Sequence, residues 1–276
     1  MQHRRPAPYD ACASHACYTK EVIDSHVHLD ADQYPDPSGA IKRARDAGVS
    51  AIVVPGVGPA SNRRAVELGR KFPGVIFPAL GFHPERFEHS EDDARAVLEM
   101  IQRERDAICA VGEVGLPWYG ERASDVAVRD AARITLARFA RMAAALDLPL
   151  ILHAPHDRAG EALVTVRDAG VARAVFHWHK SDEQTTRAIL NAGYFISLSP
   201  EVAYRERDQD LARMLPADRM LVESDGPWPY GGQFAGRLTE PAMVKEVVAA
   251  IAHLRCTTFE EIATATTANA RALFRI

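Results

Sequence analysis

The residues of this sequence that could do chemistry follow short apolar runs. His26 and His28 stand two positions apart directly after the run 22–24. On a strand, side chains two positions apart point to the same face, so these two imidazoles can share one metal ion. A pair of surface histidines is the alternative that this spacing alone leaves open.

A carboxylate follows another apolar run. Glu113 lies between Gly112 and Gly115, directly after a strand-like segment. Burying a carboxylate there costs free energy unless it is paired or bound to a metal. Its two oxygens can bridge two cations, which an imidazole does less readily. An acid at a helix N-terminus, or one paired with an arginine, is the competing interpretation.

Two more histidines end successive apolar runs, His153 after 149–152 and His177 after 174–176. One such histidine is typical of a hydrogen-bonded core, but two at equivalent places indicate a shared site. His179 faces the same side as His177 if the strand continues. It is then a metal ligand or a substrate contact; the alternative is that it caps the next helix.

The last run, 220–222, precedes Glu223 and Asp225. Asp225 is the final acid of the series, and Glu223 can face inward as a hydrogen-bond partner of a ligand. A loop acid is the alternative for either residue. Taken together, the set offers four imidazoles and two carboxylates as metal ligands. It consists of His26, His28, Glu113, His153, His177 and Asp225.

Positioning such a set requires a regular alternation of strands and helices. Eight apolar, β-branched runs predict strands at 22–24, 50–54, 75–80, 107–111, 149–152, 174–176, 194–198 and 220–222. Segments with helical periodicity between and after them include 92–105, 125–146, 182–191, 241–254 and 259–274. This order predicts an α/β fold, a single-domain (β/α)8 TIM barrel, whose catalytic groups come from the C-terminal ends of the strands. An open doubly wound sheet is the alternative.

Length and composition fit this fold. The chain has 276 residues, and one such barrel needs about 250. Residues 1–20 show neither the strand nor the helix periodicity and are expected to form a flexible N-terminal extension, leaving 21–276 as the barrel. The formal net charge of −4 argues against a protein that wraps long nucleic acid, because such proteins usually carry a basic stripe.

Other features bear on the compartment. The four cysteines have no CxxC spacing, which favours a reducing environment. Neither a signal peptide nor an apolar run long enough for a membrane span is evident. We therefore expect a cytoplasmic protein without membrane contact or a stable protein partner.

With these residues in view, the chain resembles the TatD family of metal-dependent hydrolases, amidohydrolase-like barrels that include deoxyribonucleases. The segments that carry the resemblance run from residue 22 to residue 274. They are IDSHVHLD, ALGFHPE with His83, AVGEVGL, LILHAP, FHWHKS, VESDGPW and TTANARALF.

The resemblance implies a role for each residue. His26, His28, Glu113 and Asp225 would hold one divalent cation, and Glu113 would bridge to a second held by His153 and His177. His83 would contact the substrate or its phosphate. The imidazole and carboxylate ligands suit Zn, Mn or Fe, and the family also admits Mg or Mn.

The chemistry of these groups leads to a hypothesis for the mechanism. Two cations would activate a water for attack on a phosphodiester, with Asp225 as the general base. Arg237, Lys180 or His83 could hold a phosphate oxygen, and the substrate would be nucleic acid or a small-molecule phosphodiester.

The sequence departs from the family pattern at three places. Pro117-Trp118 replaces an Asp-Tyr pair, residues 178–181 replace a Cys-Phe-Ser-Gly stretch, and Arg237 to Pro241 replaces an Arg-Asn-Glu-Pro stretch. These changes spare the expected ligands and fall on groups that shape the substrate pocket, so they bear on DNase specificity and not on hydrolysis.

Three other functions are alternatives to this one. An amidohydrolase acting on an ester, lactone or C–N bond is the main alternative, although no lysine between 106 and 120 could bridge metals as in its best-known subtype. A barrel that binds a partner without catalysis would be expected to lack some of the metal ligands, whereas all six positions here hold residue types that can bind metal. A nucleic-acid-binding protein would need a basic stripe. Four aromatic residues in strand-end loops could stack on a base or simply cover the pocket. They are Trp118, Trp178, Trp228 and Tyr230.

Overall fold

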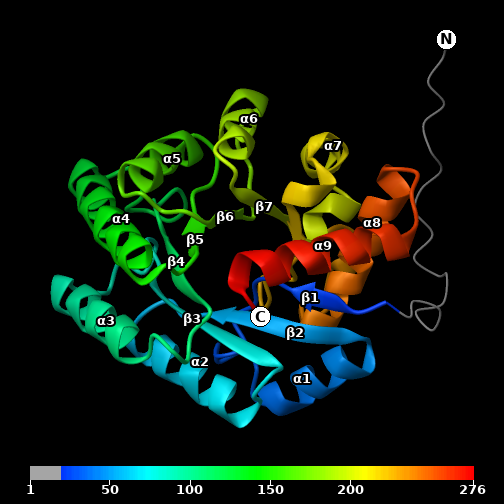
Figure 1. Cartoon of the computed structure of the whole chain (residues 1–276), viewed down its shortest axis with the longest axis horizontal. Coiled ribbons are helices and arrows are strands. Elements are labelled where there is room, and N and C mark those ends of the chain that lie inside the picture. The colour runs from blue at the N-terminus through cyan, green and yellow to red at the C-terminus, as the bar shows by residue number, and fades with distance from the viewer. Residues whose placement is uncertain (1–19) are drawn as a thin grey trace.

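A ring of parallel strands forms the centre of the molecule (Figure 1). A computed structural model describes residues 20–276, and in it eight strands pair in the order β1 to β8. The strands are β1 (Val22–Asp24), β2 (Val49–Pro55), β3 (Ile76–Phe82), β4 (Ala110–Gly115), β5 (Leu150–His153), β6 (Ala174–His177), β7 (Phe195–Leu198) and β8 (Met220–Val222).

The first and last strands meet and close the ring. The backbone N–H of Ser25, just after β1, donates to the carbonyl of Val222 at 3.0 Å, and the N–H of Asp225 donates to the carbonyl of His26 at 2.8 Å. The (β/α)8 barrel expected from the alternation of runs is therefore confirmed, and the open sheet is wrong.

Helices follow the strands around the outside of the ring (Figure 1). They are α1 (Pro37–Asp46), α2 (Pro59–Lys71), α3 (Glu91–Arg103), α4 (Val126–Leu146), α5 (Arg158–Asp168), α6 (Glu183–Asn191), α7 (Glu206–Met214), α8 (Val244–Leu254) and α9 (Phe259–Phe274). Polar caps fix where several of these helices begin. The hydroxyls of Ser90 and Thr258 accept from the third helical N–H of α3 and α9, and so satisfy backbone N–H groups that have no acceptor within the helix.

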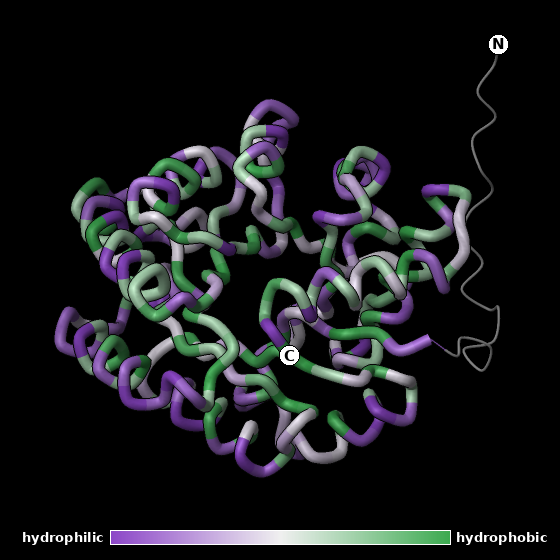
Figure 2. The backbone as a smooth tube through the Cα atoms, viewed as in Figure 1, coloured by the Kyte–Doolittle hydropathy of each residue, from purple (hydrophilic) through white to green (hydrophobic). Residues whose placement is uncertain are grey.

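The core has two layers because strand side chains alternate. On β5, Leu150 and Leu152 belong to the layer between strands and helices, whereas Ile151 belongs to a second cluster. That second cluster includes Leu273 and Phe274 of α9, and α9 crosses one end of the barrel (Figure 1). The most hydrophilic segments lie on the outer turns of the helices (Figure 2).

One strand ends later than the sequence predicted, and one expected segment lies outside the described residues. Strand β4 was expected to end at residue 111 but continues to Gly115, so Glu113 lies within the strand and not after it. The extension expected at residues 1–20 lies, except for Lys20, outside the described residues. None of the helices in the described range is both long and apolar enough to cross a membrane.

Candidate metal centre

An irregularity in β4 turns Glu113 toward the middle of the barrel. Val111 pairs with Leu150 and Val114 with Leu152, so β4 carries one residue more than β5 across this step. The extra residue is a β-bulge, a device that re-aims a side chain. Gly112 makes the bulge possible: its φ is +142°, and a Cβ there would stand 2.7 Å from that of Ile151.

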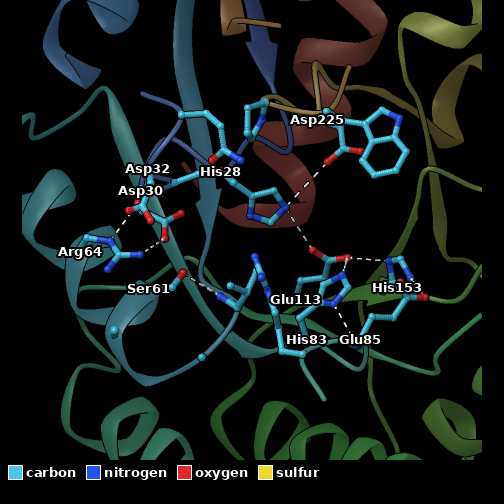
Figure 3. A pocket seen from close by; sticks show the side chains of 18 of the residues that line it. His28, Asp30, Asp32, Ser61, Arg64, His83, Glu85, Glu113, His153 and Asp225 are labelled. Carbon is cyan, nitrogen blue, oxygen red and sulfur yellow. Dashed lines mark hydrogen bonds and ion pairs between the residues drawn. The ribbon is translucent and has the colours of Figure 1, made fainter. Parts of the chain in front are cut away.

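One oxygen of Glu113 faces the histidines of the first strand. Its Oε2 lies 3.2 Å from Nε2 of His26 and 3.5 Å from Nε2 of His28. The two imidazole nitrogens are themselves 3.2 Å apart. Oδ1 of Asp225 lies 3.8 Å and 3.9 Å from the same two nitrogens. Figure 3 shows His28, Glu113 and Asp225 pointing toward one another.

The other oxygen of Glu113 faces a second group of imidazoles. Its Oε1 lies 2.6 Å from Nε2 of His177, 2.9 Å from Nδ1 of His153 and 3.3 Å from Nε2 of His83. The strand alternation that puts Ile151 and Val175 inside the barrel also points His153 and His177, two positions further along, to the inside. The carboxylate of Glu113 therefore lies between two clusters.

The hydrogen bonds around the rings indicate which nitrogens present lone pairs. Nδ1 of His28 lies 3.1 Å from the carbonyl of Pro55, so it carries the proton and Nε2 is left as an acceptor. Nε2 of His153 lies 3.2 Å from Oε1 of Glu85, so in the neutral ring a proton on Nε2 leaves Nδ1 as the acceptor. His83 is the reverse case: its Nδ1 accepts from the N–H of Glu85 at 3.1 Å, so its Nε2 is a donor.

These lone pairs suit a bound cation. Oε2 of Glu113 is buried and has no hydrogen-bond partner, although the unprotonated Nε2 of His28 is within 3.5 Å. Acceptors that face one another in this way repel unless a cation lies between them. His26, His28 and Glu113 place one ligand atom each within 4.8 Å of the others. The residues present therefore fit metal binding.

Burial and charge shift the acidities in the centre. Burial lowers the pKa of His26 to about 4, so this imidazole is neutral at pH 7. Burial opposes ionisation of Glu113, but the imidazoles of His177, His83 and His26 outweigh it and hold the pKa of Glu113 well below its usual value. Burial, together with the charges of Glu223 and Glu113, raises the pKa of Asp225 well above its usual range. A nearby cation would favour its ionised form.

Three acids, two of them fully buried and Glu85 partly so, contact the histidines of this cluster. Oε1 of Glu223 lies 3.6 Å from Nδ1 of His177, and Oε2 of Glu223 accepts from Ser197 Oγ at 2.6 Å. Asp24 accepts the N–H of His26 at 3.2 Å. Glu85 bonds His153 and accepts the backbone N–H groups of residues 118 and 119.

Sequence reasoning missed Asp24 and Glu85 as site residues. The signals were present, because Asp24 precedes His26 by two positions and Glu85 follows His83 by two.

Three residues expected to contact substrate lie elsewhere. Nε2 of buried His179 is 2.8 Å from Oγ1 of Thr186, near the start of α6. Nζ of Lys180 is 2.7 Å from Oε2 of Glu201, and the guanidinium of Arg237 donates to Glu246 at 2.7 Å and 3.1 Å. None of the three lines the cavity at the metal centre, because each polar head group is held by a partner of its own.

A cavity of about 740 Å³ opens onto the centre. His28, His83, Glu113, His153, His177 and Asp225 line its base. One side is charged, with Asp30, Asp32 and Arg64 (Figure 3). Three aromatic residues also line the cavity, Tyr119, Trp178 and Trp228.

Comparison with known proteins adds to this geometry. The family described as TatD related DNase matches residues 23–275. The chain belongs to this family. It is 31% identical to "Uncharacterized metal-dependent hydrolase YabD" of Bacillus subtilis, over 92% of this chain and 99% of that protein. It is 29% identical to "3'-5' ssDNA/RNA exonuclease TatD" of Erwinia tasmaniensis, over 92% of this chain and 100% of that protein.

A solved structure of the family has the same architecture. The crystal structure of YJJV, a TatD homologue from Escherichia coli K12, superimposes with a TM-score of 0.84 at 27% identity and covers 92% of this chain and 98% of that one. The resemblance inferred from the sequence motifs is confirmed. This protein is a metal-dependent hydrolase of the TatD family.

Proposed function

We propose that the protein is a phosphodiesterase that hydrolyses nucleic acid with two divalent cations bound at the strand ends. The observation that carries the proposal is the position of Glu113, which turns one oxygen to the imidazoles of His26 and His28 and the other to those of His153 and His177. A carboxylate that faces two such groups is suited to bridge two cations.

The ligands divide accordingly. His26, His28 and Asp225 would hold one cation with Oε2 of Glu113, and His153 and His177 would hold the other with Oε1. His83 is better suited to donate than to ligate, because the N–H of Glu85 occupies its Nδ1. Imidazole and carboxylate ligands favour Zn²⁺ or Mn²⁺ over Mg²⁺, which prefers oxygen.

The chain's own groups have distinct tasks in hydrolysis. When bound, divalent cations make a water acidic enough to act near pH 7 and neutralise charge on the phosphate. Asp225 accepts the proton of the attacking water while the oxygen of that water bonds to phosphorus and the P–O ester bond breaks, and the departing alkoxide then takes that proton from Asp225 to leave as an alcohol. The N–H at Nε2 of His83 donates to a non-bridging phosphate oxygen. Glu85 and Glu223 keep His153 and His177 in orientation.

Two observations favour a phosphodiester over an amide or lactone. The relative from Erwinia tasmaniensis carries the name of a single-stranded DNA and RNA exonuclease and matches over its full length. The cavity also has an aromatic side that could accept a base. The charged groups around it are of both signs, which suits a short strand more than a long duplex.

The test is a substrate panel on the purified protein. Short single-stranded DNA, single-stranded RNA, a lactone and an amide are each incubated with the protein loaded with Mn²⁺ or Zn²⁺, and after treatment with EDTA. We expect cleavage of the nucleic acids that EDTA abolishes and added metal restores. Hydrolysis of only the lactone or the amide would overturn the proposal.

A further inference from the structure

The aromatic side of the cavity is a continuous wall built from three loops. We call Tyr119, Trp178 and Trp228 the aromatic wall. The ring of Trp178 stands 5.7 Å from that of Tyr119 and 5.2 Å from that of Trp228, centroid to centroid. The loops after β4, β6 and β8 contribute one residue each, and all three line the cavity.

The wall adjoins the proposed metal ligands. The ring of Tyr119 is 6.4 Å from that of His153, and Trp178 directly follows His177. The backbone N–H of Trp228 donates to the carbonyl of Asp225 at 3.1 Å. A planar group lying against the wall would therefore stand next to any phosphate held at the metal centre.

Buried polar groups hold the centre of the wall in place. The indole N–H of Trp178 donates to Oε2 of Glu201 at 3.2 Å, and its backbone N–H donates to Oε1 of Glu223 at 2.8 Å. Nζ of Lys180 stands 3.4 Å from the ring centroid and pairs with Glu201. The Lys180–Glu201 pair thus acts on the position of Trp178, and this explains why Lys180 does not reach the cavity.

Trp228 gives the wall an open aromatic face. Trp228 is 47% exposed although it lines the cavity. Two other aromatic residues of these loops differ from it. Trp118, which is 38% exposed, does not line the cavity and packs against the ring of His156. Tyr230 is buried, with its hydroxyl 3.4 Å from Oδ2 of Asp225.

We propose that the aromatic wall binds the nucleobase next to the scissile phosphodiester, with Trp228 as the stacking surface. This inference rests on the proposed function, since it names a subsite of the same cavity. Bases of every kind have a flat π-face, so stacking favours the presence of a base more than its identity. The protein should therefore discriminate strongly between a nucleotide and its abasic counterpart, and weakly among bases.

The test measures binding as well as turnover. The ligands are a thymidine dinucleotide with an uncleavable methylphosphonate linkage and the same compound with both bases replaced by hydrogen. All three tryptophans of the chain lie in strand-end loops, so quenching of their fluorescence reports on this end of the barrel. The variants are Trp228→Ala and, as a matched control, Trp118→Ala, which also removes an exposed indole but none that lines the cavity.

We expect Trp228→Ala to weaken binding of the dinucleotide by about 5- to 150-fold, the range found for base–aromatic stacking. Binding of the abasic compound should change less than twofold, and Trp118→Ala should leave both unchanged. Equal binding of the two ligands by the wild-type protein, or an equal effect of the two substitutions, would overturn the inference.

Turnover of cleavable versions separates this inference from the proposed function. If dinucleotide and abasic diester are hydrolysed equally well, the wall has no role in binding but the phosphodiesterase proposal stands. If neither is hydrolysed while base-dependent binding persists, the phosphodiesterase proposal fails and the wall still binds a base.

Discussion

Nε2 of His153 lies 3.2 Å from Oε1 of Glu85, while Nδ1 of the same ring lies 2.9 Å from Oε1 of Glu113. The imidazole thus joins the carboxylate of Glu85 to that of Glu113, the proposed bridging ligand. Because Glu85 also accepts two backbone N–H groups from residues 118 and 119, it links the loops after β3 and β4 to the orientation of one ligand.

This link predicts the effect of Glu85→Gln. The neutral amide oxygen can accept from the same three donors, since all of them face Oε1 of Glu85, but it attracts the proton on Nε2 of His153 less than a carboxylate does. Substitution of such a partner typically weakens metal binding by about 10- to 100-fold. Competition with a chelator measures the dissociation constants. Glu88→Gln is the matched control, because Glu88 lines the same cavity but its side chain is 64% exposed. Equal dissociation constants for both variants would contradict a positioning role for Glu85.

The bulge at Gly112 predicts a second outcome. A Cβ at Gly112 would meet Ile151 at 2.7 Å and force a non-glycine residue to φ +142°, at a combined cost of about 2–6 kcal/mol in unfolding free energy. Gly74→Ala is the control, since φ is also positive there but no atom lies within 4 Å. Urea unfolding of the metal-free proteins should show the larger loss for Gly112→Ala. The same loss at both positions would mean that the close contact with Ile151 is unimportant.

Metal binding should stabilise the fold. Ligand at about 1,000 times its dissociation constant adds about 4 kcal/mol per site, and each kcal/mol raises the Tm of a domain of this size by about 2–4 °C. Adding Zn²⁺ or Mn²⁺ to the stripped protein should therefore raise the Tm by about 8–16 °C for each site, as measured by scanning calorimetry. A Tm that is the same with EDTA and with metal would argue that no cation binds the native state tightly.

The buried pair behind the aromatic wall predicts an asymmetry. Glu201 also contacts Trp178 and Arg207, so Lys180→Met leaves it with partners. Glu201→Gln leaves the ammonium of Lys180 buried without its carboxylate, and breaking such a pair costs up to about 3–5 kcal/mol. Chemical denaturation should show the greater loss for Glu201→Gln. A greater loss for Lys180→Met would refute this description of the network.

Much of the centre could be predicted because strands impose a direction on side chains. His153 and His177 follow buried runs whose alternation sets the face they point to, and the strand-end rule of the barrel brings distant runs together. The bulge at Gly112 could not be predicted, because an extra residue in β4 is visible only against the pairing of β5.

Loop side chains were harder to predict because loops have no periodicity. Lys180 and Arg237 were interpreted as phosphate contacts from their charge, but the structure pairs them with Glu201 and Glu246. These acids come within contact distance of Lys180 and Arg237 only in the folded chain. Tyr119 was not singled out for the same reason, although the structure places it in the aromatic wall.

The most direct test of the bridging centre is a count of bound metal in variants of its ligands. Wild-type protein, His153→Ala and Glu113→Gln are equilibrated with Zn²⁺, desalted and analysed by elemental mass spectrometry, with Glu88→Gln as the control. We predict two ions per chain for wild type and control, one for His153→Ala, and fewer than one for Glu113→Gln, because both cations share that carboxylate. Two ions retained by Glu113→Gln would contradict the account.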